Sequence, residues 1–139
     1  MTERSDKGTE ARQRVTGIGG VFFKAADPVG LLAWYREHLG VPLGDDGFAV
    51  FQWRELEPDR PAATVFAPFA ADTDYFAPSE RPFMINLRVV DLERMLAQLR
   101  AEGCQVVGDV MAGDEGRFGW VLDPEGNKIE LWEPPPERP

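Results

Sequence analysis

The sequence predicts an α+β fold in which two βαβββ units form a U-shaped sheet around a cleft. The main observation is a near-repeat: GVFFKAADPVGLLAWYREHLGV matches MINLRVVDLERMLAQLRAEGCQV at a constant offset of 64 residues, which places Lys24 on Arg88 and Asp27 on Asp91. Each copy begins with a short apolar run, continues with a helical pattern after the Asp, and is followed by three further β-like runs. A repeat of this length indicates two copies of one supersecondary unit.

The first copy contains clear helix boundaries. Asp27 is a good N-cap residue, and Pro28 stands at the first helical position, where its missing N–H would be unpaired anyway. Gly40 suits the left-handed conformation that ends many helices. Three short β-like runs follow, near residues 41–43, 47–54 and 62–67.

The second copy repeats this order, with Asp91 as the cap and Gly103 as the stop. Its β-like runs lie near residues 105–110, 117–122 and 127–132, and the turn sequence DPEGN joins the last two. In each unit one helix covers one face of the sheet and leaves the other bare. We expect the two bare faces to enclose a small-molecule cleft.

The repeats lie within one expected domain, residues 16–134, with units at about 17–66 and 82–133. Residues 1–15 are rich in charge and poor in apolar side chains, so we expect a flexible tail. Residues 135–139 form a proline-rich tail.

Composition excludes several classes of function. The chain has 15 Lys and Arg against 24 Asp and Glu, a net charge of −9, so it has no bulk attraction for nucleic acid or anionic membranes. One His and one Cys exclude histidine clusters, zinc fingers and disulfide frameworks. No apolar run has the length of a membrane helix and no signal-peptide core follows Met1, so we expect a cytoplasmic protein.

The doubled unit, with DPVGLLAWYREHLGV after the first strand and RFGWVLDPEGNKIELWEP at the end, resembles the vicinal oxygen chelate superfamily. This superfamily includes glyoxalase I, extradiol dioxygenases and bleomycin-resistance proteins. The resemblance covers Gly17 to Pro134 and implies a homodimer. It also implies four metal-ligand positions, one on the first and one on the last strand of each unit.

Those positions hold Gly20, Met84, Val65 or Phe66, and Glu130. Glycine has no ligating side chain, and a thioether does not suit the Mn, Fe, Ni or Zn that the metal enzymes use. One carboxylate cannot hold a divalent ion alone. We therefore expect no metal and no other cofactor, and a metal-dependent enzyme with atypical ligands remains an alternative.

Strand alternation assigns side chains to the cleft face. The first strand of each unit and the last strand of the second unit place there Gly20, Phe22 and Lys24; Met84, Asn86 and Arg88; Lys128, Glu130 and Trp132. In the middle strand of the first unit we favour Ala49, Phe51 and Trp53 over Phe48, Val50 and Gln52. Phe118 and Trp120 form a further aromatic pair.

Three other features concern the ligand. Glu130 is predicted to be a pocket acid, a partner of Arg88 or Arg117, or a residue kept from the family pattern without a role of its own. Arg117 is predicted to reach an anionic ligand or to lie in solvent. In the irregular segment 67–83, Tyr75 and Phe76 belong either to a flap that closes on the ligand or to a linker that docks on the sheet.

The leading hypothesis is a metal-independent protein that binds a small, partly aromatic molecule. Its predicted contact residues are Phe22, Phe51, Trp53, Tyr75, Phe76, Met84, Asn86, Arg117, Trp120, Glu130 and Trp132. One alternative is a lyase or isomerase with Glu130 as general base, because a carboxyl in an apolar cleft has a raised pKa. Another is an interaction module with a vestigial cleft.

Overall fold

The computed structural model describes residues 12–44, 47–52 and 63–136. In these ranges the chain forms β1 (Val15–Ala25), α1 (Pro28–Leu39), β2 (Ala49–Gln52), β3 (Ala63–Ala70), β4 (Phe83–Val89), α3 (Leu92–Ala101), β5 (Gln105–Gly113), β6 (Gly116–Leu122) and β7 (Lys128–Glu133). The predicted α+β class is confirmed, and β4 to β7 with α3 show the expected βαβββ order. The expected strand near 41–43 is wrong, because it is reduced to a single bridge between Leu43 and Ala49.

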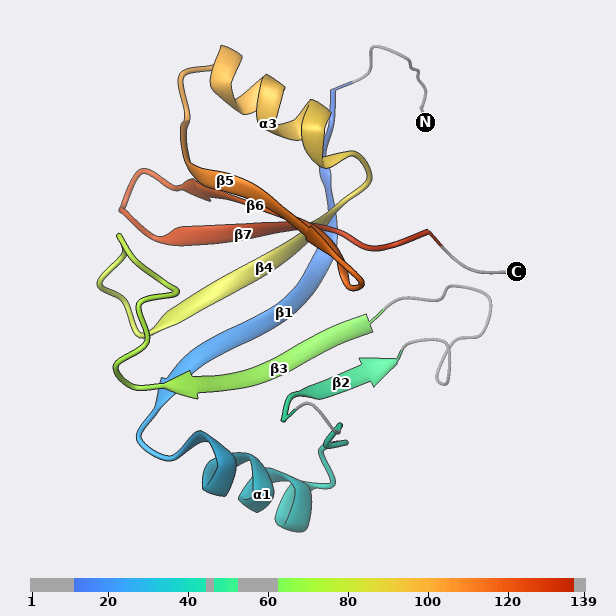
Figure 1. Ribbon diagram of the computed structural model, residues 1–139, viewed down its shortest axis with the longest axis vertical. Helices are drawn as coiled ribbons and strands as arrows, with labels where there is room; N and C mark the ends of the chain where they lie inside the picture. Colours follow the sequence, from blue (N-terminus) through green and yellow to red (C-terminus); the bar gives the residue numbers. More distant parts are fainter. Residues whose placement is uncertain (1–11, 45–46, 53–62, 137–139) are drawn as a thin grey trace.

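The described strands form one seven-stranded sheet in the order β2-β3-β1-β4-β7-β6-β5. β1 and β4 pair antiparallel at its centre, and each also pairs in parallel with the last strand of its own unit, β1 with β3 and β4 with β7. The helices lie at opposite ends of the sheet, α1 beside the first unit and α3 beside the second (Figure 1). The two halves of the sheet therefore follow the approximate symmetry of the repeat.

Both helices begin at the predicted caps. The Asp27 carboxylate accepts a hydrogen bond of 3.1 Å from the backbone N–H of Gly30, and Asp91 does the same for Arg94. Gly40 ends α1 with a φ of 69°, as its position predicted. None of the helices in the described ranges is long and apolar enough to cross a membrane.

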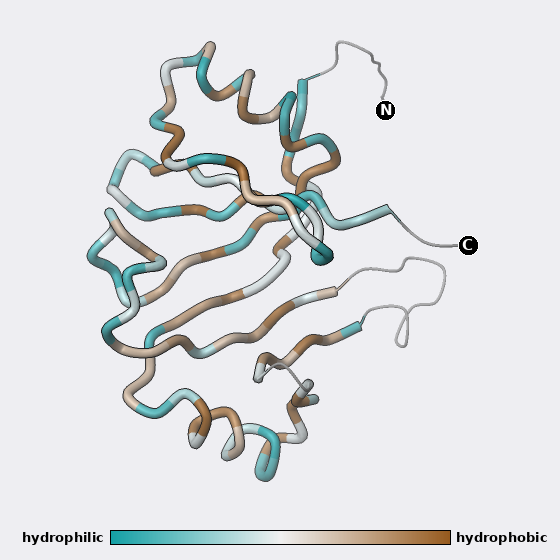
Figure 2. Tube along the Cα trace, in the orientation of Figure 1, coloured by the Kyte–Doolittle hydropathy of each residue, from teal (hydrophilic) through white to brown (hydrophobic). Residues whose placement is uncertain are grey.

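Two hydrophobic clusters hold the sheet in place. One lies between α3 and the second unit and contains Val89, Leu92, Met95, Leu96 and Leu131. The other lies on the opposite face of the sheet and contains Phe22, Ala67, Phe76, Met84 and Trp120. Hydrophobic and hydrophilic residues alternate along β4 and β7, the two strands that carry Asn86 and Glu130 (Figure 2).

The start of β1 lies next to α3. The strand begins at Val15, and Gln13, a residue of the expected tail, exchanges two hydrogen bonds with Gln98: its backbone N–H donates at 2.9 Å and its carbonyl accepts at 3.2 Å. Arg12 forms an exposed ion pair with Glu102. These contacts join the first described residues to the helix of the second unit.

Candidate functional site: an aromatic cavity around Glu130

The inner face of the sheet surrounds a cavity of about 450 Å³. Its wall includes Val50 of the edge strand β2 and Phe118 of β6, so the sheet curves far enough for its two halves to face each other. Six of the lining side chains are aromatic: Phe22, Phe48, Phe69, Tyr75, Phe118 and Trp132. The other described residues of the wall are Val50, Val65, Ala67, Asn86, Glu115 and Glu130. A cavity of this size and composition is typical of a small-molecule site.

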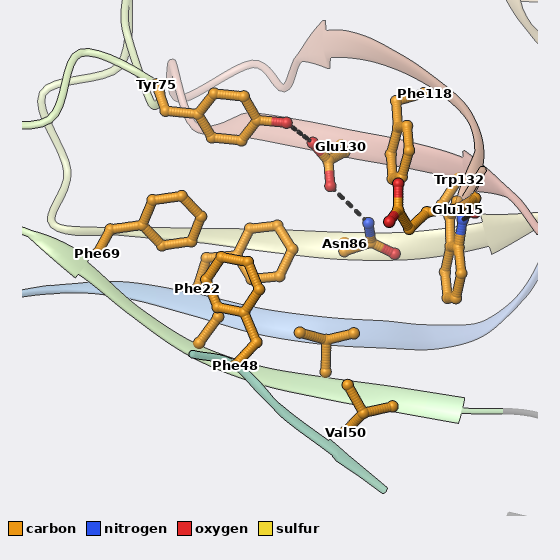
Figure 3. A pocket seen from close by; sticks show the side chains of 12 residues that line it. Phe22, Phe48, Val50, Phe69, Tyr75, Asn86, Glu115, Phe118, Glu130 and Trp132 are labelled. Atoms are coloured by element: carbon orange, nitrogen blue, oxygen red, sulfur yellow. Dashed lines mark hydrogen bonds between the residues drawn. The ribbon is translucent and has the colours of Figure 1, made fainter. Parts of the chain in front are cut away.

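The aromatic side chains form two groups (Figure 3). In the first, Phe69 stacks on Tyr75 with ring centroids 5.5 Å apart, and Phe22 and Phe48 pack against Phe69 at 5.3 and 5.8 Å. The second is a stacked pair, Phe118 and Trp132, at 6.3 Å and an interplanar angle of 5°. The Trp132 indole N–H donates to the Glu115 carbonyl, which fixes this ring at the Glu115 end of the cavity.

Glu130 lies between the two aromatic groups and is 1% exposed. It stands in β7 directly opposite Asn86 in β4 and Trp120 in β6, so the strand register brings all three side chains to the same face. Its Oε1 accepts a hydrogen bond of 2.7 Å from Asn86 Nδ2, and its Oε2 accepts one of 3.0 Å from Trp120 Nε1. The Tyr75 hydroxyl also donates to Oε2.

Burial dominates the electrostatics of this network. Removal from water raises the pKa of Glu130 above its ordinary value, although the hydrogen bonds from Tyr75, Asn86 and Trp120 and the nearby Lys128 ammonium act in the opposite direction. Burial and the Glu130 carboxyl also raise the pKa of Tyr75, so this phenol stays protonated and acts as a donor. Burial lowers the pKa of Lys128.

Five of the predicted contact residues do line the cavity: Phe22, Tyr75, Asn86, Glu130 and Trp132. Trp120 contacts Glu130 from beside the wall, while Phe76 and Met84, both 0% exposed, lie in the adjoining hydrophobic cluster. Contact between any of these residues and a ligand stays a prediction.

The predicted orientation of the middle strand is wrong. Val50 pairs with Val65 and both line the cavity, so Ala49 and Phe51 face the other side of β2. The reason is that α1 covers that side: Tyr35 packs edge-on against Phe66, the residue opposite Ala49. Trp53 lies outside the described residues.

Of the two predicted positions of Arg117, the one at the cavity is wrong, because Arg117 does not line the wall. Arg117 forms an ion pair with Glu93 of α3, on the helix side of β6. Strand alternation explains this, because Phe118 faces the cavity and its neighbour must therefore face the helix. The hydrogen-bond partners of Glu130 among the described residues are Asn86, Trp120 and Tyr75, and not Arg117 or Arg88.

Sequence reasoning missed two parts of the wall. Val65, Ala67 and Phe69 alternate along ATVFAPFA, so the alternation that predicted the other strands would have found them. Glu115 lies in the turn between β5 and β6, where no periodicity applies.

The segment between β3 and β4 docks on the sheet. Phe76 is 0% exposed, and its ring lies 5.3 Å from that of Phe69. The Lys128 ammonium donates a hydrogen bond of 2.7 Å to the Tyr75 carbonyl and lies over the Tyr75 ring. Of the two predicted forms, a flap over the ligand or a linker docked on the sheet, the segment in this structure has the docked form.

The four positions at which the superfamily places metal ligands do not fit a metal ion here. Gly20 offers no donor, and a Cβ at this position would lie 2.7 Å from the Val65 carbonyl. Met84 is buried in an apolar cluster, and both oxygens of Glu130 accept protein hydrogen bonds. Among the described residues, no three His, Cys, Asp or Glu side chains lie close enough together to hold a metal.

A sequence profile of the Glyoxalase-like domain family matches residues 20–132. The chain belongs to this family. Its structural neighbours include members of the glyoxalase, bleomycin-resistance and dioxygenase group, the vicinal oxygen chelate superfamily that the sequence resembles. Comparison with curated protein sequences found no significant match.

Three solved structures illustrate the similarity. Methylmalonyl-CoA epimerase from Mycobacterium tuberculosis is 26% identical, with a TM-score of 0.62 over 92% of this chain and 94% of that one. A glyoxalase/bleomycin resistance protein/dioxygenase superfamily member from Vibrio splendidus 12B01 is 12% identical, with a TM-score of 0.51 over 87% and 98%. The Mn(II)-bound glyoxalase from Novosphingobium aromaticivorans is 21% identical, with a TM-score of 0.54 over 91% of this chain and 42% of that one.

Proposed function

We propose that this glyoxalase-like protein binds a small, partly aromatic molecule in the cavity around Glu130, without a metal ion. The observation that carries the proposal is the cavity wall: six aromatic side chains surround about 450 Å³, with Asn86 and Glu130 as buried polar groups between them. A flat ring fits between the two aromatic groups, and the polar pair orients its substituent. Metal independence is supported by the positions at which the superfamily places metal ligands, because Gly20, Met84 and Glu130 do not fit a metal ion there.

The expected affinity follows from the apolar area that a ligand would bury. A bicyclic aromatic ring that buries roughly 250 Å² of apolar surface gains about 6 kcal/mol at ~25 cal/mol per Å². Association costs several kcal/mol, and contacts with Asn86 and Glu130 offset part of this cost. We therefore expect micromolar to millimolar dissociation constants for simple bicyclic compounds.

The test is calorimetric titration of chelator-treated protein with naphthalen-1-ylmethanol, compared with two tryptophan variants. Val50→Trp places an indole in the cavity wall, whereas Val29→Trp adds the same side chain on the exposed surface of α1. We expect binding by the wild type and Val29→Trp, and none by Val50→Trp. Equal binding by both variants would contradict a site in this cavity, and binding that appears only after Mn²⁺ or Ni²⁺ is added would contradict metal independence.

A second candidate is an isomerase in which Glu130 takes a proton from a carbon next to a carbonyl group. The raised pKa of a carboxyl on a cavity wall favours it, because a base works best when its pKa is near the working pH. The 26% identity with a methylmalonyl-CoA epimerase also agrees with such chemistry. Against it, three protein donors already bind the carboxylate.

Deuterium exchange separates the two functions. Methylmalonyl-CoA incubated with the protein in D₂O would lose its C2 proton if the isomerase were correct, and Glu130→Gln would stop the exchange. We expect no exchange above the protein-free rate. Exchange by the wild type that Glu130→Gln abolishes would replace the binding proposal with the enzymatic one.

A further inference from the structure

One buried atom of the cavity wall has no hydrogen-bond partner among the described residues: Oδ1 of Asn86. The residue is 3% exposed, and its Nδ2 donates to Glu130 Oε1. An ionised carboxylate only accepts, so this bond fixes the orientation of the amide and leaves Oδ1 as the free acceptor. A buried acceptor without a donor is unfavourable, so the cavity is suited to a ligand that brings an N–H or O–H group to this atom.

The charged side chains of the described wall indicate whether the donor group of the ligand is cationic, neutral or anionic. Its two charged side chains are both acids, Glu130 in the middle and Glu115 at one end. Lys128 does not line the cavity; its ammonium donates to the Tyr75 carbonyl and lies over the Tyr75 and Trp120 rings. Arg88, two residues beyond Asn86 in β4, does not line the cavity either. The two acids of the described wall therefore favour a cation over an anion, and the Lys128 ammonium, which also acts on Glu130 from outside the wall, weakens this preference without reversing it.

The aromatic groups add to this preference. The faces of aromatic rings carry partial negative charge and attract cations that have lost part of their water. The Phe118–Trp132 stack lies beside Glu130 and offers ring surface to a cationic group bound at the carboxylate (Figure 3). Tyr75 does not add to this effect, because its hydroxyl edge points to Glu130, one face stacks on Phe69 and the Lys128 ammonium lies over its ring.

We propose that the ligand of this cavity is an organic cation, a protonated amine or amidine attached to a flat apolar ring. The nitrogen donates to Asn86 Oδ1 and to Glu130 Oε1, which among the described residues accepts one hydrogen bond, from Asn86, and the ring lies against the aromatic side chains. This inference rests on the proposed binding function and narrows it to one class of ligand.

Three probes with the same ring test the inference: naphthalen-1-ylmethylamine, naphthalen-1-ylmethanol and naphthalen-1-ylacetate. Calorimetry at pH 7.5 with chelator-treated protein should show the amine binding about tenfold more tightly than the alcohol, and the acetate more weakly than both. If the alcohol or the acetate binds as tightly as the amine, the cation preference is wrong while the binding function stands. If none of the three binds, both fail.

Two exposed carboxylates provide a matched pair of variants. Glu115→Gln removes a charge from the cavity wall, whereas Glu125→Gln removes one from the turn between β6 and β7, away from the wall. We expect Glu115→Gln to weaken amine binding by about threefold and alcohol binding by less than amine binding, and Glu125→Gln, away from the wall, to change neither. Glu130→Gln, once urea unfolding shows that it is folded, should remove the preference for the amine. An amine preference that persists in Glu130→Gln would overturn the inference.

Discussion

The most specific prediction about the buried network concerns the hydroxyl group of Tyr75. Tyr75→Phe keeps the ring that stacks on Phe69 at 5.5 Å and meets Trp120 edge-on at 6.1 Å, and it removes only the donor to Glu130. A hydrogen bond to an ionised group contributes about 1.5–3 kcal/mol, and a neutral one about 0.5–1.5 kcal/mol. Because Tyr75 is only partly buried, we expect a loss near the lower end, about 1.5 kcal/mol when Glu130 is ionised.

The loss should depend on pH. Burial raises the folded-state pKa of Glu130, so the carboxyl is neutral at acid pH and ionises as the pH rises through that raised value. The variant should therefore lose about 0.5–1 kcal/mol at pH 4 and about 1.5 kcal/mol at pH 8.5. At the alkaline end this corresponds to a fall in Tm of about 5 °C for a chain of this length.

The chain offers a matched control, because its other tyrosine, Tyr35, packs on Phe66 on the helix-covered face of the sheet, away from Glu130. Urea unfolding of Tyr75→Phe and Tyr35→Phe at both pH values measures the difference. Tyr35→Phe should change the free energy of unfolding by less than about 0.5 kcal/mol at either pH. Equal effects of the two substitutions, or a Tyr75→Phe effect that shrinks as the pH rises, would refute the described network.

Three further predictions concern stability and the cavity. Folding raises the pKa of Glu130, so the stability that this carboxyl contributes is present below its unfolded pKa and is lost as the pH rises through its folded pKa. Glu130→Gln should therefore flatten the fall in the free energy of unfolding between pH 4 and 8, measured by urea unfolding. Gly19→Ala should weaken naphthalen-1-ylmethanol binding in calorimetry, because a Cβ there would overlap side chains of the cavity wall, whereas Gly17→Ala, with nothing within 4 Å, should bind normally. Phe76→Ala should lower the free energy of unfolding by about 3–5 kcal/mol, and the more exposed Phe83→Ala by much less; equal losses would mean that the segment before β4 is not docked.

The sequence was sufficient to predict the fold because the repeat carries its own boundary signals. Asp27 and Asp91 begin the helices at equivalent positions, and Gly40 ends the first helix. The expected strand near 41–43 was the exception: an isolated run of three residues has few ladder partners, and here only Leu43 forms a bridge.

The site could be predicted only for strands whose sequence shows clearly which side chains face the core and which face the cavity. Asn86 and Glu130 were placed correctly at the cavity because their strands alternate cleanly between apolar core and cavity positions. Phe51 was misplaced because both faces of β2 carry apolar side chains, so either orientation buries hydrophobic surface and only the position of α1 decides. The Tyr75 contact with Glu130 spans 55 residues, and no local pattern predicts it.

The most direct test of the account is a crystal structure of the chelator-treated protein grown with saturating naphthalen-1-ylmethanol. The account predicts electron density for the ring between the Phe69–Tyr75 and Phe118–Trp132 stacks, its hydroxyl group within hydrogen-bond distance of Asn86 or Glu130, and no metal ion on the carboxylate. A ring bound outside this cavity, or a metal ion coordinated by Glu130 despite the chelator, would contradict it.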